Sequence, residues 1–212
     1  MFVKLIIIPE RGSVAVTVAD ENSGGAEHFF VSRGLWQKLV AETPIKELDP
    51  VDSDTYDRIA MSAEMTSALK EGSRIIGNAD RSESEVARRL KQKGFSSTAV
   101  EYAVTVLKKH GYLDEDEICV RVAELQLRSK HYGRRRILTY LLSHGYKSEA
   151  AEAAVDSITE EDYADALRYN IKKKFPNISG LDRAEKQKAI ASLMRLGFGT
   201  GEIFDAIKEK NR

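Results

Sequence analysis

From about Asp54 to the end of the chain, apolar residues recur at the three- and four-residue spacing of amphipathic helices. Capping signals divide this stretch into nine predicted helices, at 54–77, 82–93, 97–110, 114–130, 134–144, 148–157, 160–175, 183–196 and 200–210. The pattern differs before residue 50, where Pro9, Pro44 and Pro50 lie. Because proline is excluded from helix interiors, we expect an irregular or β-rich front and a helical body.

The front of the chain shows the pattern of short strands. Val14, Val16 and Val18 alternate with smaller or more polar residues, which is typical of a half-buried strand. The predicted strands cover 2–8, 14–18 and 28–31, joined by turns at 11–13 and 22–25, with a short helix around 35–41 and a linker over 41–53. A three-stranded meander is marginally stable alone, so we expect it to pack on another element.

Four short motifs in the helical body pair a glycine with an aromatic residue: Gly94-Phe95, Gly111-Tyr112, Gly145-Tyr146 and Gly197-Phe198. Glycine directly after a helix favours the left-handed conformation that ends it, and the next residue then contacts the helix residue four positions before the glycine. That earlier residue is leucine in every case: Leu90, Leu107, Leu141 and Leu193. We therefore predict four helix ends of the same type.

Three of these turns are evenly spaced along the chain. Gly145 lies 51 residues after Gly94, and Gly197 lies 52 residues after Gly145. Such a period indicates an internal repeat, here of three helices with a helix–turn–helix core. The predicted fold is mainly α, an elongated array of tandem three-helix repeats preceded by a small β-meander. The expected parts are 1–50, 51–113, 114–159 and 160–212.

The charge distribution changes the picture of a neutral protein. Apolar residues make up 42% of the chain, enough for a core, and the formal net charge is zero. Residues 1–80, however, carry 8 Lys and Arg against 13 Asp and Glu, which leaves residues 81–212 with a net charge of +5. The basic C-terminal two-thirds hints at an anionic partner.

The sequence offers little for catalysis, metal binding or membrane insertion. The single cysteine, Cys119, allows no internal disulfide, which favours a reducing cytoplasm, and its apolar neighbours favour a buried core thiol. The acidic run 114–117 is interpreted as a helix N-terminus, and the glycines at 197–201 lack the spacing and context of a nucleotide loop. The apolar run 5–8 is too short to cross a membrane. We expect no cofactor, no metal, no membrane partner and no enzymatic activity.

Basic residues are the candidate functional groups. Arg88 and Lys91 share a helix face, with Arg89 beside them. Tyr132-Gly133 leads into Arg134, Arg135 and Arg136, and three guanidinium groups at a helix N-terminus oppose the helix dipole. With no visible compensation in the sequence, they favour contact with phosphates or an acidic protein surface, and the alternative is a solvated basic face.

Two further candidates have simpler explanations beside the functional one. Lys172, Lys173 and Lys174 lie at a predicted helix C-terminus, where the helix dipole already favours cations. Tyr132 could stack on a base or pack under the turn.

These motifs together resemble the RecX family of RecA regulators. Residues 82–95 resemble its first repeat, Gly111 to Asp114 the turn into the second, and Tyr132-Gly133 followed by 135–145 its most recognisable motif, within a likeness spanning about 55–211. The resemblance implies a non-catalytic bacterial protein that lodges in the groove of the RecA–DNA filament and modulates filament growth, ATP hydrolysis and strand exchange.

The resemblance also implies a set of contacts. The plausible contact residues are Arg88, Arg89, Lys91, Tyr132, Arg134, Arg135 and Arg136, with the three lysines at 172–174 as weaker candidates. The expected partners are the RecA filament and, weakly, single-stranded DNA, bound by a monomer. The alternative is a sequence-specific helix–turn–helix DNA-binding protein, whose recognition helix would read the major groove.

Overall fold

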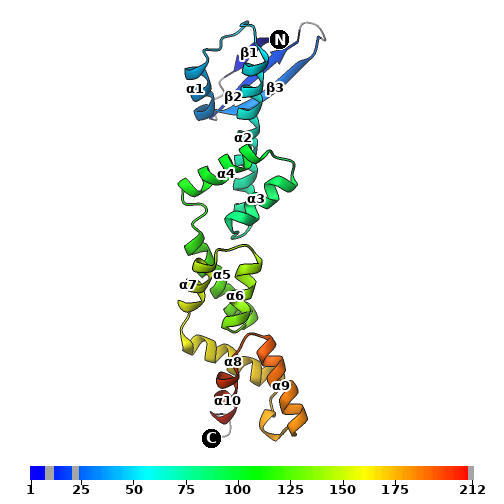
Figure 1. Ribbon diagram of the computed structural model, residues 1–212, viewed down its shortest axis with the longest axis vertical. Helices are drawn as coiled ribbons and strands as arrows, with labels where there is room; N and C mark the ends of the chain where they lie inside the picture. The colour runs from blue at the N-terminus through cyan, green and yellow to red at the C-terminus, as the bar shows by residue number, and fades with distance from the viewer. Residues whose placement is uncertain (8–11, 21–23, 210–212) are drawn as a thin grey trace. The chain divides into compact units, whose positions relative to one another are not determined.

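The computed structural model describes residues 1–7, 12–20 and 24–209 (Figure 1). The nine predicted helices appear with ends within one residue of those expected, and the predicted final residue, 210, lies outside the described part. They are α2 (Ser53–Asn78), α3 (Glu83–Gln92), α4 (Ser97–Lys109), α5 (Glu115–Lys130), α6 (Arg134–Ser143), α7 (Ser148–Asp156), α8 (Glu160–Lys174), α9 (Arg183–Arg195) and α10 (Thr200–Glu209). The fold is mainly helical, as the sequence predicts.

The predicted meander is an antiparallel sheet in the order β1 (Phe2–Ile7), β2 (Ser13–Ala19) and β3 (Ala26–Ser32). The predicted short helix follows as α1 (Arg33–Glu42). The turns predicted at 11–13 and 22–25 fall partly on Arg11, Asn22 and Ser23, which lie outside the described residues.

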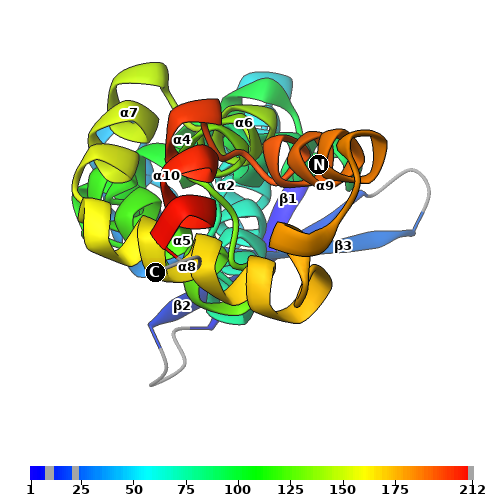
Figure 2. The ribbon, with the colours of Figure 1, turned by 90° about the horizontal axis from the view of Figure 1, so that it is seen from below.

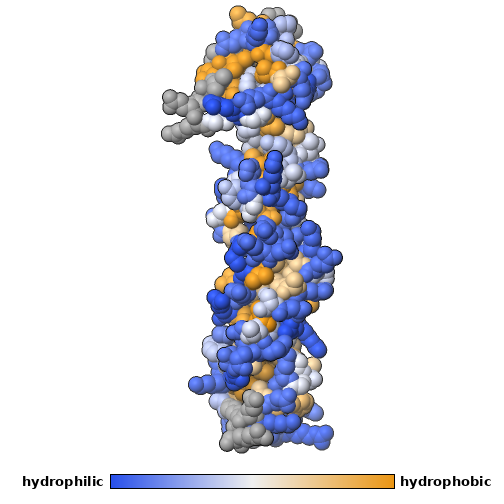
Figure 3. Space-filling view, turned by 90° about the vertical axis from the view of Figure 1, so that its left-hand side faces the viewer, coloured by the Kyte–Doolittle hydropathy of each residue, from blue (hydrophilic) through white to orange (hydrophobic). Residues whose placement is uncertain are grey.

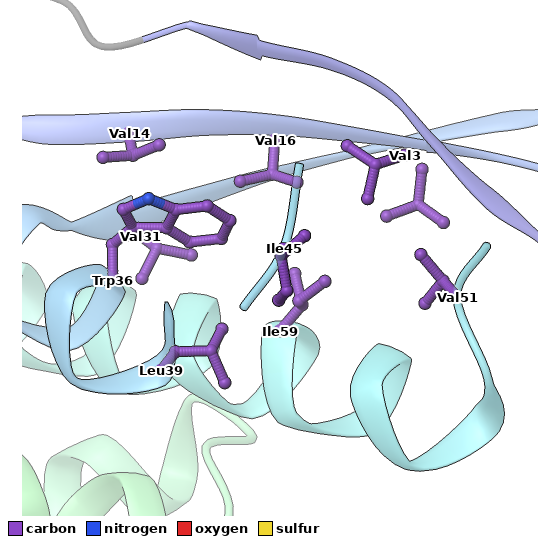
Figure 4. Packing of buried hydrophobic residues seen from close by; sticks show 10 residues of the cluster. Val3, Val14, Val16, Val31, Trp36, Leu39, Ile45, Val51 and Ile59 are labelled. Carbon is purple, nitrogen blue, oxygen red and sulfur yellow. The ribbon is translucent and has the colours of Figure 1, made fainter. Parts of the chain in front are cut away.

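One face of the sheet is covered by helices (Figure 4). Val14, Val16 and Val31 project from the strands toward Trp36 of α1 and Ile59 of α2, and all five are buried. This burial supplies the apolar contact that a three-stranded sheet needs. The expectation that the meander packs on another element is confirmed.

The segment interpreted as a linker, 41–53, begins in the last residues of α1 and ends at the first of α2, and its residues 47–51 pack along β1. The amide of Val3 donates to the carbonyl of Asp49 at 2.9 Å, and the amide of Leu48 donates to Val3 at 2.7 Å. Ile45 and Val51 are buried in the same core. The two prolines prevent a helix here but do not prevent an extended strap, and the apolar side chains fix it to the sheet.

Contacts divide the chain into two compact units. Unit 1 holds residues 1–79 and 86–112, and unit 2 holds 80–85 and 113–212. Helix α2 packs against both β3 and α4, so the sheet and most of the first repeat share one unit. In unit 2, α5, α6 and α7 form one triplet, and α8, α9 and α10 form another, with α10 beside α8 (Figure 2).

The four Gly-aromatic turns have the geometry predicted for them. The glycines adopt left-handed φ values of 90°, 73°, 79° and 99°, in chain order. At Gly145, the amide of the following Tyr146 donates to the carbonyl of Leu141 at 3.2 Å, and that of Gly145 donates to Leu142 at 3.0 Å. The same two bonds recur at the other three turns, and all four leucines are buried. These are Schellman ends that satisfy the last carbonyls of each helix.

One short element was not predicted. A 3₁₀ helix, η1 (Ile178–Gly180), joins α8 to α9 and buries Ile178 completely. It follows Pro176, which ends α8 without indicating what comes next.

Candidate partner-binding surface

Helix α6 carries the three consecutive arginines predicted to meet a partner. Its core side is formed by Ile137 and Leu141, both fully buried. Because a helix turns about 100° per residue, Arg135 and Arg136 then point away from that core, and both are exposed.

Arg134, in contrast, is engaged within the protein. Its half-buried guanidinium pairs with the carboxylates of Asp156 and Glu160, donates to the carbonyl of Val155 at 3.3 Å and lies 4.9 Å from the centre of the Tyr163 ring. The sequence argument that these arginines lack compensation is therefore wrong for Arg134. Its acidic partners lie 22 and 26 residues away, so no local pattern could show them. A direct partner contact by Arg134 stays a prediction.

Arg135 and Arg136 form the arginine pair of α6. The Arg136 guanidinium lies 5.5 Å from the centre of the half-buried Tyr132 ring, in a cation–π contact. Within the part of the chain that the structure describes, neither arginine forms an ion pair. The Tyr132 ring packs beneath the Arg136 side chain, and its stacking on a base stays a prediction.

The helix N-terminus beneath this pair is capped by the third repeat. The amide of Gly133 donates to the carbonyl of Leu196 at 2.8 Å, and the amide of Arg135 donates to the carbonyl of Gly197 at 3.2 Å. The carbonyl end of α9 therefore meets the amide end of α6, which offsets part of the unfavourable dipole beneath the arginines. No pattern in the sequence around Gly133 indicates this contact.

The remaining candidates occupy other helices. Arg88 and Lys91 are exposed and Arg89 is half-buried, all on the part of α3 that belongs to unit 1. The lysines of the last turn of α8 are exposed in unit 2, and the Lys173 ammonium lies 3.2 Å from the Tyr169 hydroxyl and 5.4 Å from its ring centre. Of the ten candidates, the three on α3 thus belong to unit 1, and the seven on or near α6 and α8 belong to unit 2.

An aromatic stack near this site was also missed. The rings of His131 and Tyr169 lie 3.7 Å apart between centres. The buried Asn170 donates its side-chain amide to the carbonyl of His131 at 2.8 Å, which caps the end of α5. These residues join α5 to α8, and the only sequence signal for them was an asparagine in the apolar stripe of a helix.

The residues considered for chemistry take structural roles. Cys119 is fully buried, and this burial raises the pKa of its thiol to about 11, which disfavours the reactive thiolate. Asp114 caps α5 by accepting from the amide of Glu117 at 3.3 Å. The described residues contain no group of three or more His, Cys, Asp or Glu that could hold a metal ion. Of the glycines at 197–201, Gly197 accepts from the amide of Arg135 at 3.2 Å, and the amide of Gly199 donates to Glu202 at 2.7 Å.

The exposed surface is mainly hydrophilic on the face shown in Figure 3, with hydrophobic residues gathered over the sheet end of unit 1 and in short strips between helices. No helix in the described ranges is long and apolar enough to cross a membrane. On this face, the helices of unit 2 present a mainly hydrophilic surface to a partner.

The helix triplets define a class of protein, one built from successive three-helix domains. The model of the first three-helix domain of RecX matches residues 72–107, and that of the third domain matches residues 160–207. Both matches support the RecX family for this chain.

Individual proteins agree with this assignment. The regulatory protein RecX of Caldanaerobacter subterraneus subsp. tengcongensis is 29% identical over 131 residues, covering 61% of this chain and 66% of that one. The protein of the same name from Vibrio campbellii is 27% identical over 153 residues, covering 69% of this chain and 94% of that one.

Solved structures show the same fold. A crystal structure of regulatory protein RecX matches 96% of this chain and 98% of its own, with a TM-score of 0.75 at 17% identity. RecX from Lactobacillus salivarius matches 69% of this chain and 96% of its own, with a TM-score of 0.63 at 17% identity.

Proposed function

We propose that this protein regulates the RecA recombinase by binding the filament that RecA forms on DNA. Bound there, it modulates filament growth, ATP hydrolysis and strand exchange. The observation that carries the proposal is the arginine pair of α6, two exposed cations without ionic partners among the described residues, on a RecX-type fold.

The geometry supports binding to an anionic surface more than it supports catalysis of a reaction. Guanidinium groups bind phosphates and carboxylates through paired hydrogen bonds. Tyr132 holds the Arg136 guanidinium from beneath and leaves its charge at the surface. The arginine pair thus presents a basic surface in which Tyr132 positions the Arg136 guanidinium, and the partner that fits it is the phosphate backbone or an acidic face of the filament.

The test is RecA ATPase activity on single-stranded DNA with and without this protein. We expect stoichiometric amounts to slow ATP turnover or filament extension, and an unchanged rate with an unchanged filament would contradict the proposal. Replacing Arg135 and Arg136 together by glutamate should weaken the effect, while a fully active double variant would remove them as contacts.

Binding assays with DNA duplexes distinguish the predicted alternative, sequence-specific DNA binding, from this proposal. A specific reader discriminates among duplex sequences, whereas a phosphate-binding surface gives salt-dependent binding that is independent of sequence. Binding to one duplex sequence far above the others, without RecA, would favour the alternative.

A further inference from the structure

The N-terminus of α6 and the last Gly-aromatic turn approach each other backbone to backbone. A Cβ built on Gly133 would lie 2.6 Å from the carbonyl carbon and oxygen of Gly197, and 2.8 Å from a ring carbon of Phe198. The φ of Gly133 is −81°, which any residue adopts. The close approach of the third repeat, and not the local conformation, therefore requires glycine at this position.

The same contact reaches the residues that carry the arginine pair. A Cβ built on Gly197 would overlap the backbone nitrogen of Arg136, and the amide of Arg135 already donates to the Gly197 carbonyl. The docking at position 135 uses only the backbone, which leaves the Arg135 side chain at the surface. The backbone at the base of both guanidinium groups is thus held by a turn more than sixty residues away in the chain.

We propose that the third repeat positions the arginine pair for its anionic partner through the Gly133–Gly197 contact. The inference rests on the proposed function, because it concerns the same two arginines. Paired hydrogen bonds from guanidinium to phosphate or carboxylate are directional, so a small displacement of the helix start lowers their strength. Gly133 and Gly197 are then positioning residues that touch no partner themselves.

The experiment uses the full-length chain and measures its affinity for RecA filaments on single-stranded DNA at several salt concentrations. Gly133→Ala should weaken binding by about tenfold and reduce its salt dependence, as expected when a charged contact is lost. The matched control is Gly201→Ala in α10, because a Cβ at Gly201 meets nothing within 4 Å. Wild-type affinity of the Gly133 variant would overturn the inference.

A double-mutant cycle separates positioning from a general structural effect. In a chain that already carries Arg135→Gln and Arg136→Gln, we expect Gly133→Ala to cause no further loss, since its effect passes through those side chains. An equal loss in both backgrounds would overturn the inference. If Gly133→Ala fails to fold, Phe198→Leu loosens the same contact with a smaller change in volume, and the same cycle applies.

The cycle also separates this inference from the proposed function. If the two glutamine substitutions leave binding unchanged, the arginine pair is no contact, and both proposals about it fail. If they weaken binding while Gly133→Ala and Phe198→Leu do not, the contact stands and only the positioning by the third repeat is wrong.

Discussion

The N-termini of α3 and α6 both dock on a Gly-aromatic turn, by different means. At α3, the hydroxyls of Ser82 and Ser84 donate to the carbonyls of His144 and Gly145, at 2.6 and 2.9 Å. At α6, backbone amides make the equivalent bonds to Leu196 and Gly197. With a repeat period of 51 residues, Ser82 is the position equivalent to Gly133, and Ser84 is the position equivalent to Arg135.

The difference explains why position 135 of α6 can be arginine, while the equivalent position 84 of α3 is serine. Where hydroxyls make the bond, positions 82 and 84 are committed to the contact, and Ser82 is 1% exposed. Where the backbone makes it, only glycine fits at 133, but the side chain at 135 takes no part and can be long and charged. This docking of a helix N-terminus on a Gly-aromatic turn, called here the joint, uses side chains at α3. At α6 it uses the backbone, which leaves the side chain at position 135 available to a partner.

The first Gly-aromatic turn shows a third arrangement. A Cβ at Gly94 would meet nothing within 4 Å, so no backbone among the described residues closely approaches this glycine. Side chains of α2 hold it instead. Glu64 accepts from both the amide and the hydroxyl of Ser96 at 2.6 and 2.8 Å, and Glu71 pairs with Lys93 at 3.2 Å.

The largest effect should come from comparing Gly197→Ala with Gly94→Ala. Both substitutions place alanine in the left-handed region, which costs about 1–2 kcal/mol. Only at position 197 does the new methyl group also meet backbone, which adds roughly 1–3 kcal/mol of overpacking. Chemical denaturation of both variants measures the difference in the free energy of unfolding, and equal losses would refute the joint at α6.

A smaller loss is expected from Ser82→Ala, which tests the joint at α3. The substitution leaves the His144 carbonyl without its donor and removes the acceptor for the Glu85 amide, at a cost of about 1–3 kcal/mol. Ser67→Ala, at an exposed position of α2, serves as the control and should change the melting temperature little. A Ser82 variant as stable as this control would contradict the bonding described.

The neighbouring arginines of α6 should respond in opposite ways. Arg134→Gln removes ion pairs whose carboxylates are mostly exposed, so a loss of about 1 kcal/mol or less is expected in stability. Arg135→Gln should leave the melting temperature unchanged but weaken filament binding. The assignment of roles would be reversed if Arg135→Gln destabilised the fold and Arg134→Gln did not.

The smallest effect concerns pH and the turn at Gly94. The hydrogen bond from Arg74, reinforced by Lys93, lowers the pKa of Glu71 to about 2. A carboxylate whose pKa falls on folding contributes stability above its unfolded value, near 4.5, and that contribution is lost as pH falls toward 2. Between pH 5 and pH 2, the melting temperature should therefore fall less steeply with decreasing pH for Glu71→Gln than for the wild type. Parallel curves would show that the pairing contributes nothing.

The helices could be predicted from the sequence because the signals that end them are local. The leucine, the glycine and the aromatic residue that form each Schellman end lie within six consecutive residues, as at 141–146. The strap at 41–53 was mistaken for a linker because its partner, β1, lies more than forty residues earlier. For the candidate site, local pattern identified the arginines but not which of them were engaged.

The sequence by itself determined the helix ends and the three arginines at the start of α6, because each depends on residues a few positions apart, and the recurrence of the same local motif determined the repeat. Only the tertiary structure decided that Arg134 is paired internally, that Gly133 is required by contact with Gly197, and that Arg135 and Arg136 remain at the surface. Those outcomes depend on which distant carbonyls and carboxylates approach α6, and the periodicity of one helix carries no information about them.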